Sequence, residues 1–458
     1  MFGLKIEKSE TSQFGQLYAQ LRDKILQGEI PPGAKLSSSR ELAKELKISR
    51  GIALEVMDQL KIEGFVEAKN GSGTYVLPRL ELKGYKPGEN ASRSGVEQTN
   101  APTALSLIAG VPDWELFPKR AWNDCYKKTV EYAGEKELGY CAPQGRADLR
   151  EALKEYLFRA KGIRTETGNI FITAGGAQAF SIIGQIRGNA KIILEDPLAT
   201  FICDILKSRD CECLFAPADE QGIIPESIPD GKADFIYVSP SHQFPLGGYL
   251  PASRRVELLG LAKEIGAYVI EDDYDGEYRY DCRPTAALQV LAPDRVIYTG
   301  TFSKILSPAL RLAYMVVPES LIKRCAEIKS GRDYYNDGLS QAAMARFVNQ
   351  GYLERHIRKS ARAYLNKKKR LEDTIRFLLG PDWKILGNAT GLHLVLQKPG
   401  YNFNEDFKEE MRQKGFIFRT VGDYCVQNRS HADKLVVGYA RRNGEELERA
   451  VRALKDLI

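Results

Sequence analysis

The feature that most constrains the fold is a series of short apolar runs that alternate with helical patterns from Leu105 to the C-terminus. The clearest runs cover residues 192–194, 235–238, 268–270, 296–298 and 314–317. Strands that are buried on both faces of a parallel sheet are almost continuously apolar, and the helices between them form the crossovers. We therefore predict an α/β architecture with a mostly parallel sheet for residues 105–458.

The first 77 residues have a different pattern. Apolar residues fall at helical spacing at positions 14, 17, 18, 21 and 25 and again at 53, 56, 57 and 60, and another helix starts near Ser39. Ser49 is a good N-cap for the last of these helices, and two β-type runs then surround an Asn-Gly turn within residues 65–76. Three helices and a hairpin predict a winged helix-turn-helix over residues 1–77, whose helix at about 49–63 would enter the major groove of DNA.

Charge alone does not identify the partner of this small domain. Residues 1–79 hold 12 basic and 10 acidic side chains, a net charge of +2, and the whole chain carries +6. A helical protein-binding domain is therefore the alternative to a DNA-binding domain. If the partner is DNA, the candidate contacts to phosphates or base edges are Lys35, Ser38, Ser39, Arg40, Ser49, Arg50, Lys69, Gly71 and Gly73.

Residues 78–104 separate these two regions. They are rich in Pro, Gly, Ser and Asn and poor in large apolar residues, which is typical of an extended linker. A chain of 458 residues is expected to hold two to four domains, so one small and one large domain joined by a linker fit its length.

Several other classes of protein are excluded by the cysteine, histidine and hydropathy patterns. The eight cysteines form no CxxC pair and the four histidines are scattered, so neither a disulfide framework nor a metal site is predicted. No apolar stretch reaches 18 residues, and the N-terminus lacks a secretory pattern. We expect a cytoplasmic protein with reduced thiols and no membrane segment.

Six segments of the large region stand out as candidate parts of a functional site. Each has an ordinary explanation when it is taken alone: Lys304 as a surface lysine, Asp272 and Asp273 as a solvated loop or a metal site, and residues 172–178 as a tight strand-to-helix turn. In chain order the segments are 110–118 with Trp122, 140–150, 172–178, 238–247, 271–280, and 299–304 with Arg311.

The N-terminal region resembles the GntR family of bacterial repressors. The resemblance is carried by residues 33–43, 48–50, 63–65 and 71–76. The family usually has Pro at the position of Ser37, and Thr-Val where this chain has Ile52 and Ala53. It implies that the domain binds operator DNA.

The six segments together resemble the fold-type I aminotransferases that use pyridoxal 5′-phosphate (PLP). The resemblance implies a smaller C-terminal α+β subdomain and a Schiff base at Lys304. It implies that Asp272 forms an ion pair with the pyridinium nitrogen of the cofactor, with Asp273 as the alternative. It also implies that Tyr274 forms a hydrogen bond with the phenolic oxygen of the cofactor. Phe244 stands where the enzymes have Asn, and His242 nearby is interpreted as structural or surface rather than catalytic. The implied phosphate ligands are Thr301, Ser303, Arg311, Gly176 and Ala177.

Three positions depart from the enzymes and argue against efficient transamination. Ala199 takes the place of the aromatic residue that stacks on the cofactor ring, with Phe201 as a substitute, and Gly176-Ala177 lacks two polar side chains. Val436 aligns with the arginine that holds the substrate carboxylate, a loss that should weaken α-amino acid binding. Effector-binding candidates are Tyr140 and Arg441, the latter with Arg442 as a neighbour.

The two resemblances together are typical of the MocR/GabR subfamily of GntR regulators, and they cover nearly the whole chain. We therefore predict a transcription regulator that senses PLP itself or an amine such as an amino acid, and that forms a homodimer, head to tail, on its operator. One alternative is an active aminotransferase with a DNA-binding appendage. Another is a DNA-binding protein whose large domain only dimerises.

Overall fold

The computed structural model describes residues 2–7, 11–69, 71–78, 80, 104–280, 286–427 and 431–458. The chain divides into two compact units, Met1–Asn100 and Ala101–Ile458. The predicted linker, residues 78–104, lies almost entirely outside the described residues, so its limits stay a prediction. Asn70 of the predicted hairpin turn and Cys282 also lie outside them.

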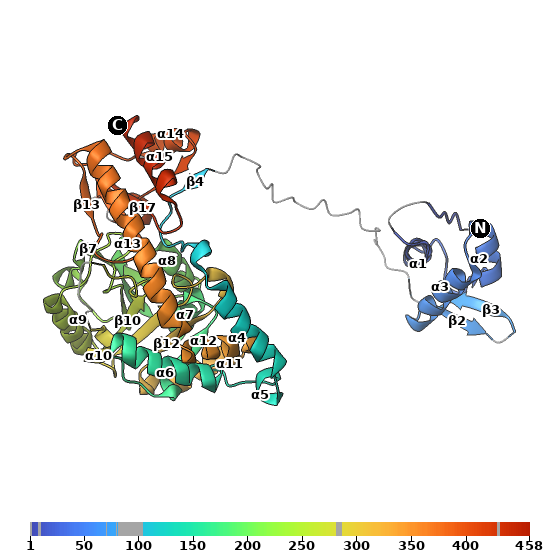
Figure 1. Cartoon of the computed structure of the whole chain (residues 1–458). Helices are drawn as coiled ribbons and strands as arrows, with labels where there is room; N and C mark the ends of the chain where they lie inside the picture. The colour runs from blue at the N-terminus through green and yellow to red at the C-terminus, as the bar shows by residue number, and fades with distance from the viewer. Residues whose placement is uncertain are drawn as a thin grey trace. The chain divides into compact units, whose positions relative to one another are not determined.

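The N-terminal unit contains three helices and a three-stranded antiparallel sheet of order β1-β3-β2, which confirms the predicted winged helix-turn-helix (Figure 1). Each helix starts after a serine, Ser12, Ser38 or Ser49, whose hydroxyl accepts a hydrogen bond from an amide of the first turn. The elements are α1 (Gln13–Leu26), β1 (Lys35–Leu36), α2 (Ser39–Leu46), α3 (Arg50–Ile62), β2 (Val66–Lys69) and β3 (Gly73–Val76).

The large unit is built on an eight-stranded sheet of order β5-β12-β11-β10-β9-β6-β7-β8. Five central strands, β11 to β7 in this order, are mutually parallel, as predicted. β12 is antiparallel to both of its neighbours, because it returns directly after the turn that follows β11. The strands are β5 (Ile170–Thr173), β6 (Lys191–Asp196), β7 (Glu212–Asp219), β8 (Gly222–Ile223), β9 (Phe235–Val238), β10 (Tyr268–Asp273), β11 (Val296–Thr301) and β12 (Ala313–Val316).

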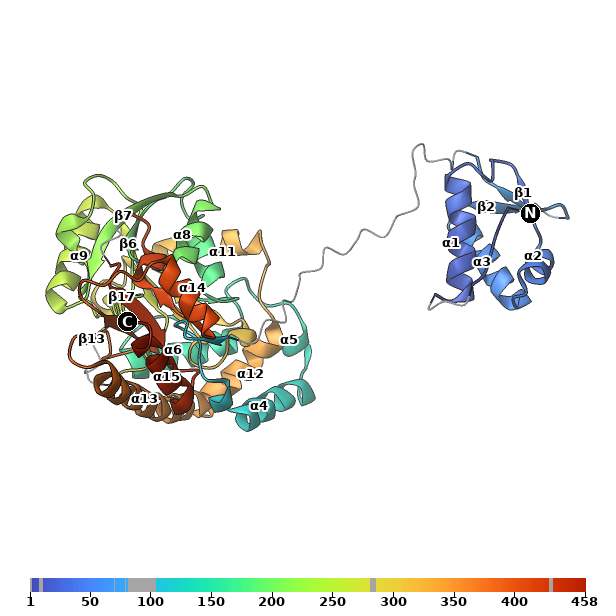
Figure 2. The same ribbon diagram turned by 90° about the horizontal axis from the view of Figure 1, so that it is seen from above.

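Helices cover both faces of this sheet and bury separate apolar clusters against it. Figure 2 shows α4, α5 and α12 grouped together, in agreement with the packing of α12 against both α4 and α5. The helices are α4 (Lys119–Glu131), α5 (Glu135–Leu138), α6 (Ala147–Lys161), α7 (Gly176–Ile183), α8 (Thr200–Lys207), α9 (Ala252–Ile265), α10 (Leu288–Leu291), α11 (Glu319–Ser330) and α12 (Gly338–Asn349).

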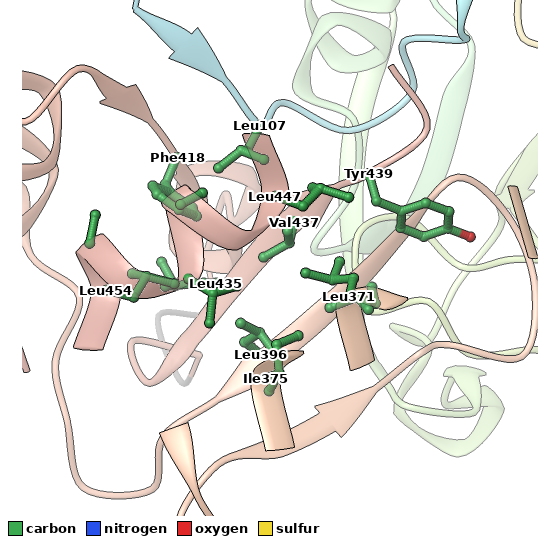
Figure 3. Close-up of a cluster of buried hydrophobic side chains, with 14 of the residues drawn as sticks. Leu107, Leu371, Ile375, Leu396, Phe418, Leu435, Val437, Tyr439, Leu447 and Leu454 are labelled. Atoms are coloured by element: carbon green, nitrogen blue, oxygen red, sulfur yellow. The ribbon is translucent and has the colours of Figure 1, made fainter. Parts of the chain in front are cut away.

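A smaller α+β subdomain ends the chain, as expected. Its four-stranded antiparallel sheet has the order β13-β14-β17-β16, and a two-stranded sheet joins β15 to β4. Leu371 and Ile375 of the long helix α13 pack on Leu396, Leu435 and other residues of the subdomain core (Figure 3). The elements are β4 (Leu105–Ser106), α13 (Tyr352–Leu379), β13 (Lys384–Leu386), β14 (His393–Gln397), α14 (Glu405–Gln413), β15 (Phe416–Ile417), β16 (Arg419–Thr420), β17 (Lys434–Gly438) and α15 (Gly444–Lys455).

None of the helices in the described part of the chain is both long enough and apolar enough to cross a membrane.

Candidate functional site

Four segments that carry predicted site residues converge at one edge of the large sheet. Strands β9, β10 and β11 are parallel neighbours, and β5 runs in the same direction because β12 is antiparallel to both β11 and β5. The carboxyl ends of strands that run in one direction share an edge, which is where open α/β sheets bind ligands. The segments that follow these four strands therefore face one site.

Lys304 lies at this edge, in the turn that follows β11. A Cβ built on Gly110 would lie 3.3 Å from its Nζ, so the predicted segment 110–118 passes directly beside the amine. Burial lowers the pKa of Lys304, while the charges of Asp275 and Asp272 oppose the shift. A lowered pKa increases the fraction of neutral amine, which is the form that attacks a carbonyl.

Asp272 is the last residue but one of β10, and its charge acts on Lys304. Its carboxylate accepts hydrogen bonds from the hydroxyls of Tyr237 (2.9 Å) and Thr299 (3.1 Å). Burial nevertheless raises the pKa of Asp272 to about 6, because the two hydrogen bonds do not offset the loss of solvent. A cationic group placed against this carboxylate would lower that pKa again.

Asp273, the predicted rival, has other partners. Its carboxylate forms an ion pair with Lys161 (2.7 Å) and accepts a hydrogen bond from Tyr298 (2.6 Å). Successive side chains of a strand point to opposite faces of the sheet, so Asp272 and Asp273 face different sides of β10. The geometry favours Asp272 as the carboxylate beside Lys304.

Tyr274 contacts an aspartate–histidine pair. Its hydroxyl lies 2.9 Å from Nδ1 of His242, and the same nitrogen lies 2.9 Å from Oδ1 of Asp275. His242 is not a surface residue, since only 1% of it is exposed. Phe244 packs edge-on against Tyr274 at 6.1 Å between ring centroids. Burial and the neighbouring carboxylates raise the pKa of Tyr274 well above its usual range, so its phenol keeps its proton.

The predicted phosphate ligands border the start of α7. Gly175 precedes this helix with φ of 100°, and a Cβ there would lie 3.0 Å from the Arg311 guanidinium, which donates a hydrogen bond to the Ala174 carbonyl. Gly176 and Ala177 form the first turn, whose amides have no acceptor within the helix. Helix N-termini of this kind bind phosphate.

The two predicted hydroxyl ligands, Thr301 and Ser303, are both partly buried: Thr301 ends β11, and Ser303 lies in the turn before Lys304. The Thr301 hydroxyl accepts a hydrogen bond from the Ser303 amide at 3.1 Å, which keeps its own hydrogen free to donate. The two hydroxyls and Arg311 therefore all lie in one short stretch of chain, between the last residue of β11 and the start of β12.

The predicted effector residues are exposed. Tyr140 is 89% exposed and contacts Tyr334 and Tyr335 edge-on. Arg441 stacks on Trp114 at 4.0 Å, and Arg442 donates a hydrogen bond to the Ser106 carbonyl. Val436 is fully buried in β17. Phe201, the expected substitute for the ring-stacking aromatic residue, is 51% exposed on α8.

In the N-terminal unit most predicted DNA contacts are exposed. Ser38 and Ser49 already serve as N-caps of α2 and α3, and Lys69 lies 3.3 Å from Glu67 and above the ring of Tyr75. Gly73 has a φ of 123°, and a Cβ there would overlap the Lys35 side chain. The exposed residues are Lys35, Ser38, Arg40, Ser49, Arg50, Lys69, Gly71 and Gly73, while Ser39 is partly buried.

Sequence reasoning did not find several residues of this site. Tyr237 lies in a predicted strand and Thr299 in the predicted segment 299–304, but the pattern assigns a role to neither, although both donate to Asp272. Asp275 lies in the predicted segment 271–280, three residues after Asp272, also without an assigned role. His393 comes from β14, more than 100 residues away in sequence, and no local pattern marks it.

The residues His242, Asp275 and His393 are the one group in the described ranges whose possible metal ligand atoms lie within 4.8 Å of one another. Nδ1 of His242 is in direct hydrogen-bond contact with both oxygens of Asp275, at 2.9 and 3.0 Å. His242 and Asp275 therefore form a hydrogen-bonded pair. The described cysteines are free, and none belongs to the group.

Two families match the sequence. Residues 14–76 match the bacterial regulatory proteins of the gntR family, and residues 114–454 match the class I and II aminotransferases. The pyridoxine biosynthesis transcriptional regulator PdxR of Corynebacterium glutamicum is 32% identical, over 83% of this chain and 82% of that protein. The probable rhizopine catabolism regulatory protein MocR of Rhizobium meliloti is 30% identical, over 83% of this chain and 80% of that protein.

Among solved structures, a kynurenine aminotransferase of Pyrococcus horikoshii, crystallised with PMP, is similar to this chain. The TM-score is 0.71 at 25% sequence identity, and the match covers 77% of this chain and 90% of the enzyme. The large unit thus has the aminotransferase fold.

Proposed function

Because the chain belongs to the MocR/GabR subfamily of GntR-type transcription regulators, we propose that its large domain binds pyridoxal 5′-phosphate at Lys304 and that this binding controls how the N-terminal domain holds operator DNA. The regulator would act in the bacterial cytoplasm, where its operator is.

The arrangement around Lys304 is the observation that carries this proposal. An amine of lowered pKa lies near a buried carboxylate of raised pKa, and the start of α7 lies beside Arg311. Both flanking glycines keep space open, because a Cβ on Gly110 or Gly175 would approach Lys304 or Arg311 to 3.3 or 3.0 Å. An aldehyde, a basic ring nitrogen and a phosphate are the groups that this set of donors and acceptors suits.

When it is bound, the cofactor supplies an electrophilic carbon and an electron-withdrawing ring. Lys304 would hold it covalently, Asp272 would hold a proton on its ring nitrogen, and Tyr274 beside Phe244 would donate to its phenolic oxygen. The phosphate would be bound by the backbone amides of α7, by two hydroxyls and by one guanidinium. These phosphate ligands are Gly176, Ala177, Thr301, Ser303 and Arg311.

For DNA, we propose that α3 enters the major groove with Arg50 at its start, and that Lys35, Arg40 and Lys69 meet phosphates. The exposure of these four side chains supports this assignment. Ser38, Ser39, Ser49, Gly71 and Gly73 would contribute hydroxyls or backbone amides that approach the DNA closely.

We propose a homodimer, with the head-to-tail arrangement that is common in the subfamily. Large apolar side chains around α4 and α5 support dimerisation: Val130, Tyr132, Leu138 and Tyr140 are 51%, 71%, 69% and 89% exposed. An exposed apolar patch of this kind usually marks a protein interface.

The effector is PLP itself in the version that we favour. Val436 is buried where the enzymes have a carboxylate-binding arginine, so an α-amino acid would lack its main anchor. The similarity to a pyridoxine biosynthesis regulator supports the same choice. An amino compound bound near Tyr140 and Arg441 is the other version.

The test is to add PLP to the purified full-length protein and to record its visible absorption. We expect wild type to acquire an absorption band that persists through gel filtration, and Lys304→Ala to lose it. A wild-type protein that stays colourless would overturn the proposal. Titration with amines separates the two effector versions, because a change of the band with one amine would contradict the PLP-only version.

An active aminotransferase is the second candidate, and the similarity of fold to a working enzyme favours it. Multiple turnovers with an amino donor and a keto acceptor would support it. A single half-reaction without turnover would instead support a sensor.

A further inference from the structure

We propose that His242 is a positioning residue: Asp275 holds its proton on Nδ1, and this bond directs the Tyr274 hydroxyl to donate into the site beside Lys304. The inference rests on the proposed function, because the acceptor of that hydroxyl would be the phenolic oxygen of the cofactor. It goes further by assigning a role to a histidine and an aspartate outside the predicted cofactor ligands.

Three oxygen atoms, from two residues, lie within hydrogen-bond distance of a single nitrogen of His242. Nδ1 of His242 lies 2.9 and 3.0 Å from the two oxygens of Asp275 and 2.9 Å from the Tyr274 hydroxyl. The rings of His242 and Tyr274 are stacked with centroids 5.7 Å apart. The three residues come from two segments, since His242 follows β9 while Tyr274 and Asp275 follow β10.

The surroundings of Asp275 fix the position of the proton. Oδ2 of Asp275 also accepts the Leu392 amide at 3.2 Å, so this carboxylate acts as an acceptor on that side. An imidazole nitrogen carries either one hydrogen or one lone pair, and a lone pair on Nδ1 would face two carboxylate oxygens. The proton therefore belongs on Nδ1, where it bonds to Asp275.

This tautomer determines what Tyr274 can do. A protonated Nδ1 cannot accept a hydrogen bond, so the Tyr274 hydroxyl cannot donate to it. The oxygen of the Tyr274 hydroxyl is instead the acceptor in this contact. The hydroxyl hydrogen must point elsewhere. Burial and nearby carboxylates keep that hydrogen in place by raising the pKa of Tyr274. Tyr274 is thus a donor whose direction is set before a ligand arrives.

The histidine ring has no room to turn. A Cβ on Gly391 would lie 1.9 Å from Cε1 and 2.1 Å from Nδ1 of His242, so the backbone there packs directly on the ring. The ring of His393 lies 4.6 Å away on another side, and burial and His242 lower the pKa of His393 to about 3. His393 is therefore neutral and does not compete for Asp275.

The remaining nitrogen of the ring supports a positioning role. Nε2 of His242 is buried and has no hydrogen-bond partner among the described residues. The hydrogen-bond contacts of the ring with Asp275 and Tyr274 are both made at Nδ1. Contacts of this kind suit a residue that orients a neighbouring side chain, and not a residue that transfers a proton.

The test uses side chains that imitate one ring nitrogen each. The Asn amide reaches the position of Nδ1, and the Gln amide reaches that of Nε2. In full-length protein loaded with PLP, the visible band is titrated with pH for wild type, His242→Asn, His242→Gln, Tyr274→Phe and the double variant His242→Gln/Tyr274→Phe. Apart from His242, the titratable groups around Tyr274, which include Asp275, Asp272, Tyr237 and Glu195, are unchanged in all of them.

A hydrogen bond to an anionic oxygen stabilises the deprotonated form, so its loss moves the midpoint to higher pH. We expect Tyr274→Phe and His242→Gln to raise the midpoint by about 1 pH unit each, and His242→Asn to leave it within about 0.3 unit. The double variant should match Tyr274→Phe alone, because His242 acts through Tyr274. A midpoint in His242→Gln equal to that of wild type, or additive shifts, would overturn the proposal.

A second measurement does not depend on the cofactor or on the variants. In wild-type protein without PLP, with ¹⁵N-labelled histidine, the His242 signals should show a protonated Nδ1 and an unprotonated Nε2. A proton on Nε2 would overturn the inference. If wild type acquires no visible band, the proposed function fails, while the nitrogen signals still decide the tautomer of His242.

Discussion

At the scale of single residues, Asp272 and Asp273 are neighbours in sequence with opposite surroundings. We expect Asp272→Asn to raise the Kd for PLP about tenfold or more, because the charge that would face the ring nitrogen is lost. Asp273→Asn should leave this Kd within about threefold, yet lower the free energy of unfolding by about 2 kcal/mol, because Lys161 loses its closer partner and keeps only Glu277. Absorbance titration and urea unfolding of both variants measure the two quantities. The reverse pattern would assign the ring nitrogen to Asp273.

The buried carboxyl group of Glu195 should make the stability of the protein depend on pH. Burial raises the pKa of Glu195 to about 7, although its carboxylate accepts hydrogen bonds from the amide (3.1 Å) and hydroxyl (2.7 Å) of Ser239. A raised carboxyl pKa contributes stability that is present below the unfolded-state value and is lost as pH rises through about 7. Between pH 5.5 and 8 the wild type should therefore lose about 2 kcal/mol relative to Glu195→Gln.

Urea unfolding of the protein without PLP at both pH values measures this difference. Glu195→Gln is a suitable reference, since its amide oxygen can keep both hydrogen bonds from Ser239. A difference between the two proteins that is equal at pH 5.5 and 8 would show that Glu195 keeps an ordinary pKa.

At the scale of elements, the start of α7 depends on a glycine. Gly175 has a φ of 100°, and a side chain there would press on the guanidinium of Arg311. We expect Gly175→Ala to weaken PLP binding about tenfold or more, because both the amides and the arginine would shift. Gly188→Ala is the matched control, since no atom lies within 4 Å of its Cβ position. Equal loss in both variants would contradict the role of this turn.

Helix α3 is tested through its exposed basic residues. Arg50 stands at the start of the helix and Lys61 in its last turn. We expect Arg50→Ala to weaken binding to the DNA upstream of its own gene about tenfold or more, while Lys61→Ala changes it less. If Arg50 meets a phosphate, the slope of log K against log salt should also fall by about 1. Gel-shift titrations at several salt concentrations measure both effects, and equal losses in the two variants would argue against this orientation of α3.

The element scale also shows what the sequence could predict. The parallel strands and the residues that follow them were found because apolar runs and strand-end motifs are local signals. The antiparallel direction of β12 could not be predicted, since its apolar run at 314–317 is like the runs of the parallel strands. The contact of His242 with Asp275 and with His393 joins three distant segments, and His393 arrives from the C-terminal subdomain. Such a cluster exists only after the two subdomains pack, so neither spacing nor composition marks it.

At the scale of the whole molecule, the regulator hypothesis requires a coupling between two sites on separate units. A ligand shifts a conformational equilibrium only by the difference between its affinities for the two states, and the effect is reciprocal. If PLP changes the Kd for operator DNA by some factor, operator DNA must change the Kd for PLP by the same factor. We expect a factor of about 5 to 150 in one direction or the other.

The measurement closes a thermodynamic cycle. DNA titrations with and without PLP give one factor, and PLP titrations with and without DNA give the other. Lys304→Ala should keep the DNA affinity of the PLP-free wild type and respond to PLP about tenfold less, since the covalent anchor is absent. If the DNA affinity of the wild type is the same at all PLP concentrations, PLP binding and DNA binding are not coupled. The large domain would then serve dimerisation or catalysis, and the reciprocal factor would be 1 in both arms.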